Sequence, residues 1–211
     1  MYLSAIEIDT SIPAGRKWLS DPYRVHSQLY RAFADPKGER VLFRIEDQRE
    51  QPRVIVQSRG EPNWSAAFAG ERFVRRQQQK EVRLAIHAGQ RLRFLLRANP
   101  TIRRKHDRKD PTNKEKDSRR YGLLREDEQR AWLLRKGEAG GFRPLAFEVR
   151  SAGQIDFARG RGEGAGRQTH VSVDFEGVLE VTDAAAFLAA IEAGIGPAKG
   201  FGFGLVSVAP E

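Results

Sequence analysis

Short apolar runs, interrupted by one helical pattern, fill the first half of the chain. In residues 2–8 polar and apolar positions alternate, which predicts a strand with one face, including Ile6 and Ile8, half buried. The elements expected after it are a helix opened by Asp21 and Pro22 and running to about Ala34, a hairpin of strands at 40–46 and 53–58, a short helix at 64–69 and a strand at 73–85. This β-α-β-β-α-β order is that of a ferredoxin-like domain.

The second half of the chain predicts the same order of elements with an added hairpin. A turn at Gly89 separates the halves, so we expect an α+β protein of two tandem ferredoxin-like domains, residues 1–88 and 89–211. The elements expected in the second domain are a strand at 91–97, a helix at 126–136, strands at 142–150, 154–159, 168–173 and 175–181, a helix from Asp183 to 193 and a strand at 205–208. The strands at 154–159 and 168–173 form the inserted hairpin, and its tip is basic.

Charge narrows the class of partner. The 211 residues carry 37 Lys and Arg against 28 Asp and Glu, a formal charge of +9, and such an excess favours a polyanionic partner. Part of it lies in residues 101–120, which hold nine Lys or Arg and hardly any apolar residue, so a mobile basic loop is expected there.

Cysteine and histidine usage narrows the possible chemistry. With no cysteine the chain has neither disulfides nor thiolate metal sites, which fits a reducing compartment. Its four histidines never stand at helical i,i+3 or i,i+4 spacing, so no metal or other cofactor is expected. No run approaches the roughly 18 apolar residues of a membrane span, and we expect a soluble, cytoplasmic protein with no membrane partner.

The run 194–204 brings five glycines and Lys199 together ahead of the last strand. Glycines such as Gly200 and Gly202 let the backbone approach a ligand closely, and exposed N–H groups beside a lysine form a concavity for anions. Three interpretations fit: a nucleic-acid backbone site, a nucleotide pocket, or a tight turn without ligand. The spacing matches neither a Walker motif nor a dinucleotide fingerprint, which favours the first.

Other basic side chains and one histidine are candidate functional residues. Arg159, Arg161 and Arg167 flank the tip of the predicted hairpin, where they could meet phosphates or form an ordinary solvated turn. The same two readings apply to the basic loop, whose candidates are Arg103 and Arg104. His26 follows Tyr23 by three residues and precedes Tyr30 by four on the predicted helix. It is either a general acid–base group or a histidine packed on two tyrosines.

Several segments resemble one known family from end to end. They are MYLSAIEI at the N-terminus, DPYRVH at 21–26, RANP at 97–100, AWL at 131–133, FEGVL at 175–179 and the glycine-rich ending 194–210. In this order and spacing they are similar to the CasE family, the RNA-processing endoribonucleases of type I-E CRISPR systems. The resemblance implies two ferredoxin-like domains. It further implies that CRISPR repeat RNA and the other subunits of the type I-E surveillance complex are the partners.

The resemblance also implies a reaction and a set of residues. The family cleaves without metal at the 3′ base of the repeat stem, where the ribose 2′-OH attacks the adjacent phosphate and leaves 2′,3′-cyclic phosphate and 5′-OH ends. It assigns catalysis to His26 with Tyr23. The expected RNA-binding residues are Arg24, Arg103, Arg104, Arg159, Arg161, Arg167, Lys199, Gly200 and Gly202. Two alternatives remain open: a non-catalytic RNA-binding subunit of the same fold, and a basic scaffold that assembles other subunits.

Overall fold

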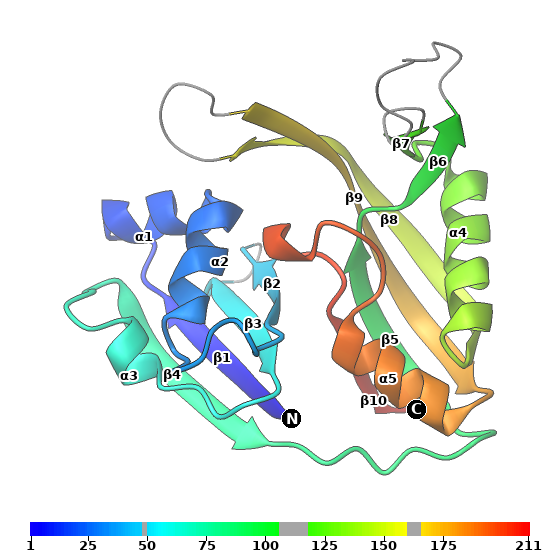
Figure 1. Ribbon diagram of the computed structural model, residues 1–211, viewed down its shortest axis with the longest axis horizontal. Helices are drawn as coiled ribbons and strands as arrows, with labels where there is room; N and C mark the ends of the chain where they lie inside the picture. The colour runs from blue at the N-terminus through cyan, green and yellow to red at the C-terminus, as the bar shows by residue number, and fades with distance from the viewer. Residues whose placement is uncertain (48–49, 106–117, 160–165) are drawn as a thin grey trace.

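The computed structural model describes residues 1–47, 50–105, 118–159 and 166–211, and its helices pack on antiparallel sheets (Figure 1). The α+β class predicted from the sequence is therefore confirmed. Two sheets have four strands each, and a smaller one has two, within the described residues. Each large sheet carries a buried apolar cluster of its own. In the same described ranges, no helix has the length and apolar character needed to cross a membrane.

The N-terminal sheet has the strand order β2-β3-β1-β4, and its neighbouring strands run antiparallel. Alternation buries Ile6 and Ile8 of the first strand, as predicted, and they join a core with Val25 and Leu29. Its strands are β1 (Tyr2–Ile8), β2 (Leu42–Glu46), β3 (Arg53–Ser58) and β4 (Val74–Glu81), and its helices are α1 (Pro13–Leu19), α2 (Pro22–Tyr30) and α3 (Trp64–Ala67).

The C-terminal sheet has the order β10-β5-β9-β8 and is also antiparallel. Its core includes the fully buried Leu133, Phe175 and Phe187. Gly177 has no room for a side chain, because an added Cβ would lie 2.1 Å from the Ala146 carbonyl oxygen of the next strand. The elements are β5 (Arg91–Ala98), α4 (Glu126–Ala139), β8 (Phe142–Arg159), β9 (Gly166–Val181), α5 (Ala184–Ala193) and β10 (Val206–Pro210).

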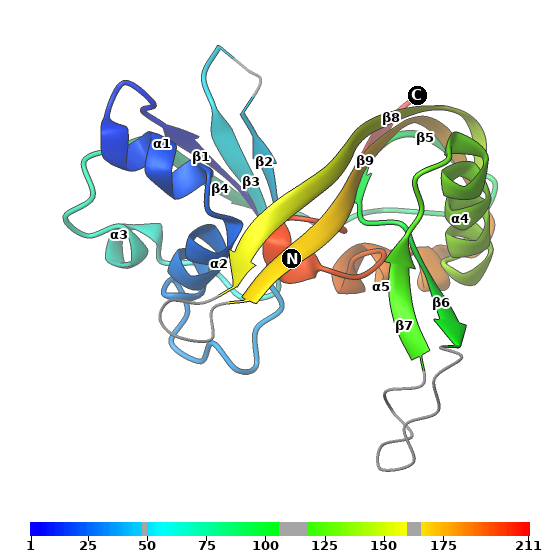
Figure 2. The ribbon, with the colours of Figure 1, turned by 90° about the horizontal axis from the view of Figure 1, so that it is seen from above.

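The expectation of four short strands between 142 and 181 is wrong. β8 and β9 are two continuous strands of 18 and 16 residues, so the hairpin is an extension of the sheet and is not an insertion. The register shifts between Ser151 and Gly153, where Gly153 has φ 74°. A bulge of this kind bends a strand and increases its twist without ending it. The hairpin consequently curves away from its own sheet and extends over α2 (Figure 2).

The prediction of a structureless loop over 101–120 is also wrong at both of its ends. β6 (Thr101–Lys105) and β7 (Ser118–Gly122) pair antiparallel and form the two-stranded sheet. The register sets Ile102 opposite Tyr121, and such cross-strand pairs stabilise a ladder even where charged residues dominate the composition. Residues 106–117 of the predicted loop lie outside the described residues.

The first helical region differs from the prediction in two ways. Helix α2 ends at Tyr30 and does not reach Ala34; the amides of Ala32 and Phe33 donate instead to carbonyls three residues back, as in a tightened last turn. Helix α1 was not predicted. It begins at Pro13 and buries Trp18 and Leu19 in the N-terminal core, so its stability comes from packing rather than from local propensity.

The two halves meet along a seam between α2, β2 and the C-terminal elements. The short helix η2 (Lys199–Phe201), inside the glycine-rich run, contacts both α2 and β2 (Figure 1). Arg97 of β5 donates to the Ile45 carbonyl of β2 at 2.7 Å and forms a bidentate pair with Asp174 of β9 at 2.7 and 3.0 Å. One side chain thus joins both sheets.

Candidate functional site

Helix α2 presents the candidate residues because its start is fixed by its own sequence. The Asp21 carboxylate accepts from the backbone amide of Arg24 at 3.1 Å and Pro22 occupies the first turn, which confirms the predicted cap. Val25 and Leu29 are fully buried against the sheet. Residues at the intermediate helical angles, including His26, therefore lie on the flanks of the helix.

His26 is half-buried at the seam. Its ring lies 4.6 Å from the Tyr30 ring and 6.4 Å from the Phe43 ring, measured between centroids. The ring also lies close to Gly200 of η2, where an added Cβ would be 3.4 Å from both Nε2 and Cδ2 of His26. Burial lowers the pKa of His26 below 6.5, since the charged imidazolium loses hydration there. His26 is therefore neutral near pH 7 and can accept a proton.

Tyr23 is on the same helix but in a different environment. Its side chain is 45% exposed, and together with Arg24 it lines a pocket of about 610 Å³ between α1 and α2. Among the described residues, the tyrosine whose ring contacts His26 is Tyr30 and not Tyr23. The i+4 spacing already pointed to Tyr30, although no role was predicted for it from the sequence.

The glycine-rich run packs tightly at the seam between the two halves. Gly202 has φ 87°, and a Cβ there would lie 3.2 Å from the Phe43 ring; one at Gly196 would lie 3.0 Å from Trp132. The glycine backbone therefore does approach neighbouring groups closely, as the sequence predicted. The groups it approaches in this structure are side chains of the protein itself. Gly200, against His26, contributes to the same packing.

Lys199 and Arg103 come together in a basic pocket of about 530 Å³. Arg120 and Lys136 line it as well, and no acidic residue does so among its described lining residues. Burial lowers the pKa of Lys199, and the charges of Arg40, Lys136 and Arg120 lower it further. The Lys199 ammonium donates to the Gly196 carbonyl at 2.8 Å. An anion placed here would relieve the repulsion among these cations.

The structure describes the position of some, but not all, of the other arginines predicted to bind RNA. Arg104 is exposed on β6, opposite Arg119 in the register. Arg159 is the last residue of β8 and Arg167 lies at the beginning of β9, so both are at the end of the hairpin that passes over α2 (Figure 2). Arg161 lies outside the described residues. Arg40, Arg120 and Lys136 were not predicted from the sequence, because only the fold brings them to Lys199 from distant segments.

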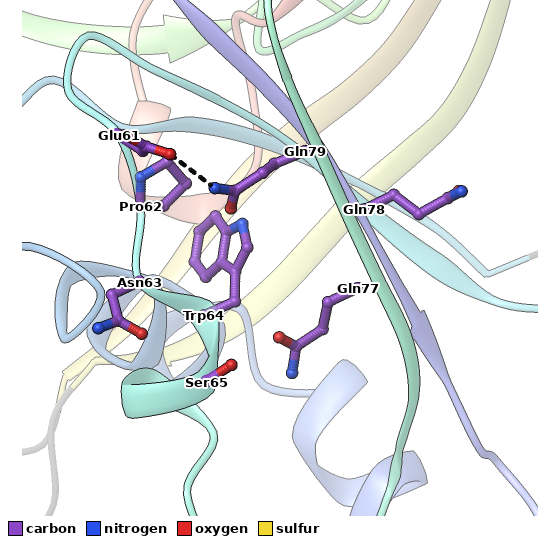
Figure 3. Close-up of a pocket in the computed structure, with 8 residues that line it drawn as sticks. All are labelled: Glu61, Pro62, Asn63, Trp64, Ser65, Gln77, Gln78 and Gln79. Atoms are coloured by element: carbon purple, nitrogen blue, oxygen red, sulfur yellow. Dashed lines mark hydrogen bonds between the residues drawn. The ribbon is translucent and has the colours of Figure 1, made fainter.

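A second polar pocket of about 580 Å³ lies between α3 and β4 (Figure 3). Gln79 donates to Glu61 across it at 3.3 Å, and Asn63 caps α3 by accepting from the Ala66 amide. None of the residues predicted from the sequence lines this pocket. As for metals, the described part of the chain contains no group of three or more His, Asp or Glu side chains that could hold an ion.

Comparisons with known proteins cover the whole chain. The family model described as "CRISPR associated protein" matches residues 1–210. The chain is 39% identical to the CRISPR-associated endoribonuclease Cse3 of Thermus thermophilus and 35% identical to the Cascade subunit CasE of Escherichia coli, in each case over 100% of both chains.

Solved structures of these relatives share the fold. The structure of Cse3 bound to a 19-nucleotide RNA superposes with a TM-score of 0.82 at 36% identity, and that of Escherichia coli Cas6e with 0.73 at 31%, both over 100% of each chain. A Thermus thermophilus Cse3 complex with an RNA representing a pre-cleavage state gives 0.81 over 99% of this chain and 98% of the other. The chain therefore belongs to the CRISPR-associated protein family of Cse3 and CasE, as the resemblance in its sequence predicted.

Proposed function

We propose that the protein is an endoribonuclease that binds the stem-loop of CRISPR repeat RNA and cuts at the 3′ base of the stem. The observation that carries the proposal is the setting of His26, a half-buried histidine kept neutral at the seam, at the position that the family resemblance assigns to catalysis. The Thermus thermophilus relative, which is named an endoribonuclease and is known in complex with RNA, supports it.

The reaction proposed for this site is a transesterification within the RNA. The ribose 2′-oxygen forms a bond to the adjacent phosphorus while the bond from phosphorus to the 5′-oxygen breaks. His26 takes the proton from the 2′-OH or supplies one to the leaving 5′-oxygen, and its lowered pKa suits the role of base near neutrality. Tyr23 helps to position the phosphate or sugar. The products are a 2′,3′-cyclic phosphate and a 5′-OH.

Negative charge that develops on the phosphate needs cationic or N–H donors. We propose Arg159 and Arg161 of the hairpin for this role and, for grip on the RNA, Arg24, Arg103, Arg104, Arg167, Lys199, Gly200 and Gly202. The basic pocket around Lys199 supports the assignment of Lys199 and Arg103. The reaction is proposed to be metal-independent, on the ground of the family resemblance.

The architecture proposed with this function is a tandem of ferredoxin-like domains, residues 1–88 and 89–211. The two matching strand orders and the two separate apolar clusters support it. We also propose that the protein stays bound to its RNA product as a subunit of a type I-E surveillance complex in the cytoplasm. The Escherichia coli relative, named a Cascade subunit, supports this placement.

Cleavage of a cognate repeat RNA by His26→Ala tests the function. Single-turnover cleavage should slow by at least about 10²-fold while RNA affinity stays within a few-fold, because the ring is needed for proton transfer and not for grip. His87→Ala, at an exposed turn, is the matched control and should cut like the wild type. An RNA with 2′-deoxyribose at the cut site should bind and stay intact, and cleavage of the normal RNA should continue in EDTA.

The outcomes separate the proposal from its alternatives. A His26→Ala variant that cuts at the wild-type rate, or cleavage of the deoxy RNA at the same bond, would overturn the assignment. Binding without cleavage by the wild type would favour the non-catalytic RNA-binding subunit. Neither binding nor cleavage would favour a scaffold that assembles other subunits.

A further inference from the structure

A second histidine, His170, packs against η2. His170 of β9 is half-buried, and its ring packs at 4.8 Å from Phe201, 5.8 Å from Phe157 and 6.0 Å from Phe203, between centroids. Phe201 is the last residue of η2 and follows Gly200, which packs on His26. The two histidines therefore contact successive residues of one short turn.

Hydrogen bonds fix the orientation and protonation of His170. The Asn99 side-chain oxygen accepts from the buried amide of Val171 at 3.1 Å, so the Asn99 amide nitrogen must be the atom that faces His170 Nδ1 at 3.0 Å. Nδ1 therefore accepts, and the ring proton is on Nε2. A protonated ring would set two donors against each other at Asn99. Burial also lowers the pKa of His170, so both effects keep the ring neutral.

The second ring nitrogen of His170, Nε2, is in a different environment from Nδ1. His170 Nε2 is buried without a hydrogen-bond partner among the described residues, whereas buried polar groups are usually satisfied. The ring is held by the aromatic side chains instead: Phe201 also stacks on Phe157, at 5.4 Å and 20°. In the register Phe157 faces Gln168 and His170 faces Ile155, so Phe157 and His170 are diagonal neighbours on the β8–β9 hairpin beyond the bulge. This part of the hairpin and the turn therefore form one packed unit.

We infer that His170 is a positioning residue for His26: oriented by Asn99, it holds the Lys199–Phe201 turn against the flank of α2 on which His26 lies. The inference rests on the proposed role of His26. His170 itself touches no reacting atom. The charged residue of the turn, Lys199, has its ammonium on the Gly196 carbonyl and not on either ring.

The experiment measures the ring of His26 as well as the reaction. The chain has four histidines, His26, His87, His106 and His170, so single substitutions assign their NMR signals. In His170→Ala the turn should loosen and water should reach His26, which moves the pKa of His26 up toward its ordinary value. Single-turnover cleavage should fall by about 10-fold with RNA affinity unchanged within about threefold, since small misplacements of a catalytic group cost rate.

Three further variants distinguish positioning from simple loss of stability. His170→Phe keeps a ring against Phe201 and should restore the pKa of His26 and most of the cleavage rate, although the hydrogen bond to Asn99 is absent. His170→Asn offers an acceptor to Asn99 without a ring and should behave like His170→Ala. Phe201→Ala removes the packing from the other side and should reproduce the effect if His170→Ala fails to fold.

An unchanged His26 titration in both His170→Ala and Phe201→Ala overturns the inference. Equal rescue by His170→Asn and His170→Phe also overturns it, because the ring packing would then not be what holds the turn. The titration needs no activity, so it still reports on the packing if His26→Ala shows that His26 has no catalytic role.

Discussion

The two halves of the molecule use one strand order for different purposes. The N-terminal order β4-β1-β3-β2 matches the C-terminal order β10-β5-β9-β8, strand for strand along the chain. The paired strands β2 and β3 have five and six residues, whereas their counterparts β8 and β9 have 18 and 16. The N-terminal half thus remains compact around α2, and the C-terminal half extends across it (Figure 2).

This difference divides the site between the halves. The N-terminal half supplies His26, while the C-terminal half supplies the turn that covers it, and neither half has the candidate site alone. Arg97 holds the arrangement at the other end of the seam through Ile45 and Asp174. If this division is correct, changes in the turn should affect the reaction, and changes in the hairpin should affect binding.

The largest effect is expected from a side chain placed between the halves at the turn. Gly200 does not have a left-handed φ, so Gly200→Val adds bulk without backbone strain, directly against His26. A displacement of about 1 Å in a catalytic group can cost roughly 10² in rate, so we expect cleavage to slow by about 10- to 100-fold. RNA affinity should fall by much less, because the other proposed RNA-binding residues remain. Single-turnover cleavage and filter binding measure the two quantities.

The size of the added group provides a graded control. Gly200→Ala, whose Cβ is at 3.4 Å from the ring, should have a much smaller effect than Gly200→Val. Ala189→Val adds similar bulk at an exposed position of α5 and should leave cleavage unchanged. Equal rates for wild type and Gly200→Val would contradict a site shared between the halves.

A smaller effect is expected from the hairpin arginines, which we propose act both in RNA binding and in stabilising the transition state. Arg159→Ala with Arg161→Ala should weaken RNA binding and flatten its dependence on salt, by about 0.7 to 0.9 in the log–log slope for each RNA phosphate that is no longer neutralised. Cleavage of RNA that is already bound should slow as well, by less than in Gly200→Val, because cationic stabilisation of the developing phosphate charge is lost. Arg83→Ala with Arg91→Ala removes the same charge from exposed positions and is the matched control. An unchanged slope would assign the hairpin arginines to a solvated tip.

The sequence predicted the parts of this arrangement that depend on local signals. Alternation placed β1 and its buried face, and Asp21 with Pro22 placed the start of α2, because caps and periodicity act within a few residues. It did not predict α1, in which Gly15 packs closely against the Asp9 carbonyl and against Phe73 of a distant segment. Nor did it predict that β8 runs unbroken through Gly153, because a bulge is defined by the pairing with the neighbouring strand and not by the local sequence.

The candidate site was predictable only as separate pieces. His26 and the glycines could be singled out by spacing and composition, but their contact joins residues 26 and 200, and no local pattern reports such a pair. His170 has the local pattern of an ordinary sheet residue, because Asn99 and Phe201, which give it a role, come from two other segments.

The smallest effect expected is on stability as a function of pH, and it compares one histidine from each half. Burial lowers the pKa of both His26 and His170 in the folded protein, while the unfolded chain titrates near 6.5. Below that pH the unfolded state binds more protons, so the free energy of unfolding should fall as the pH drops from 6.5 through the folded pKa values, and stay flat above it. The slope is limited to about 1.4 kcal/mol per pH unit for each histidine.

Urea unfolding between about pH 5 and 8 measures this slope. His26→Gln and His170→Phe should each remove one part of the slope, and the double variant should remove most of it. A wild-type slope retained in either single variant would mean that the histidine replaced there is not desolvated in the folded protein.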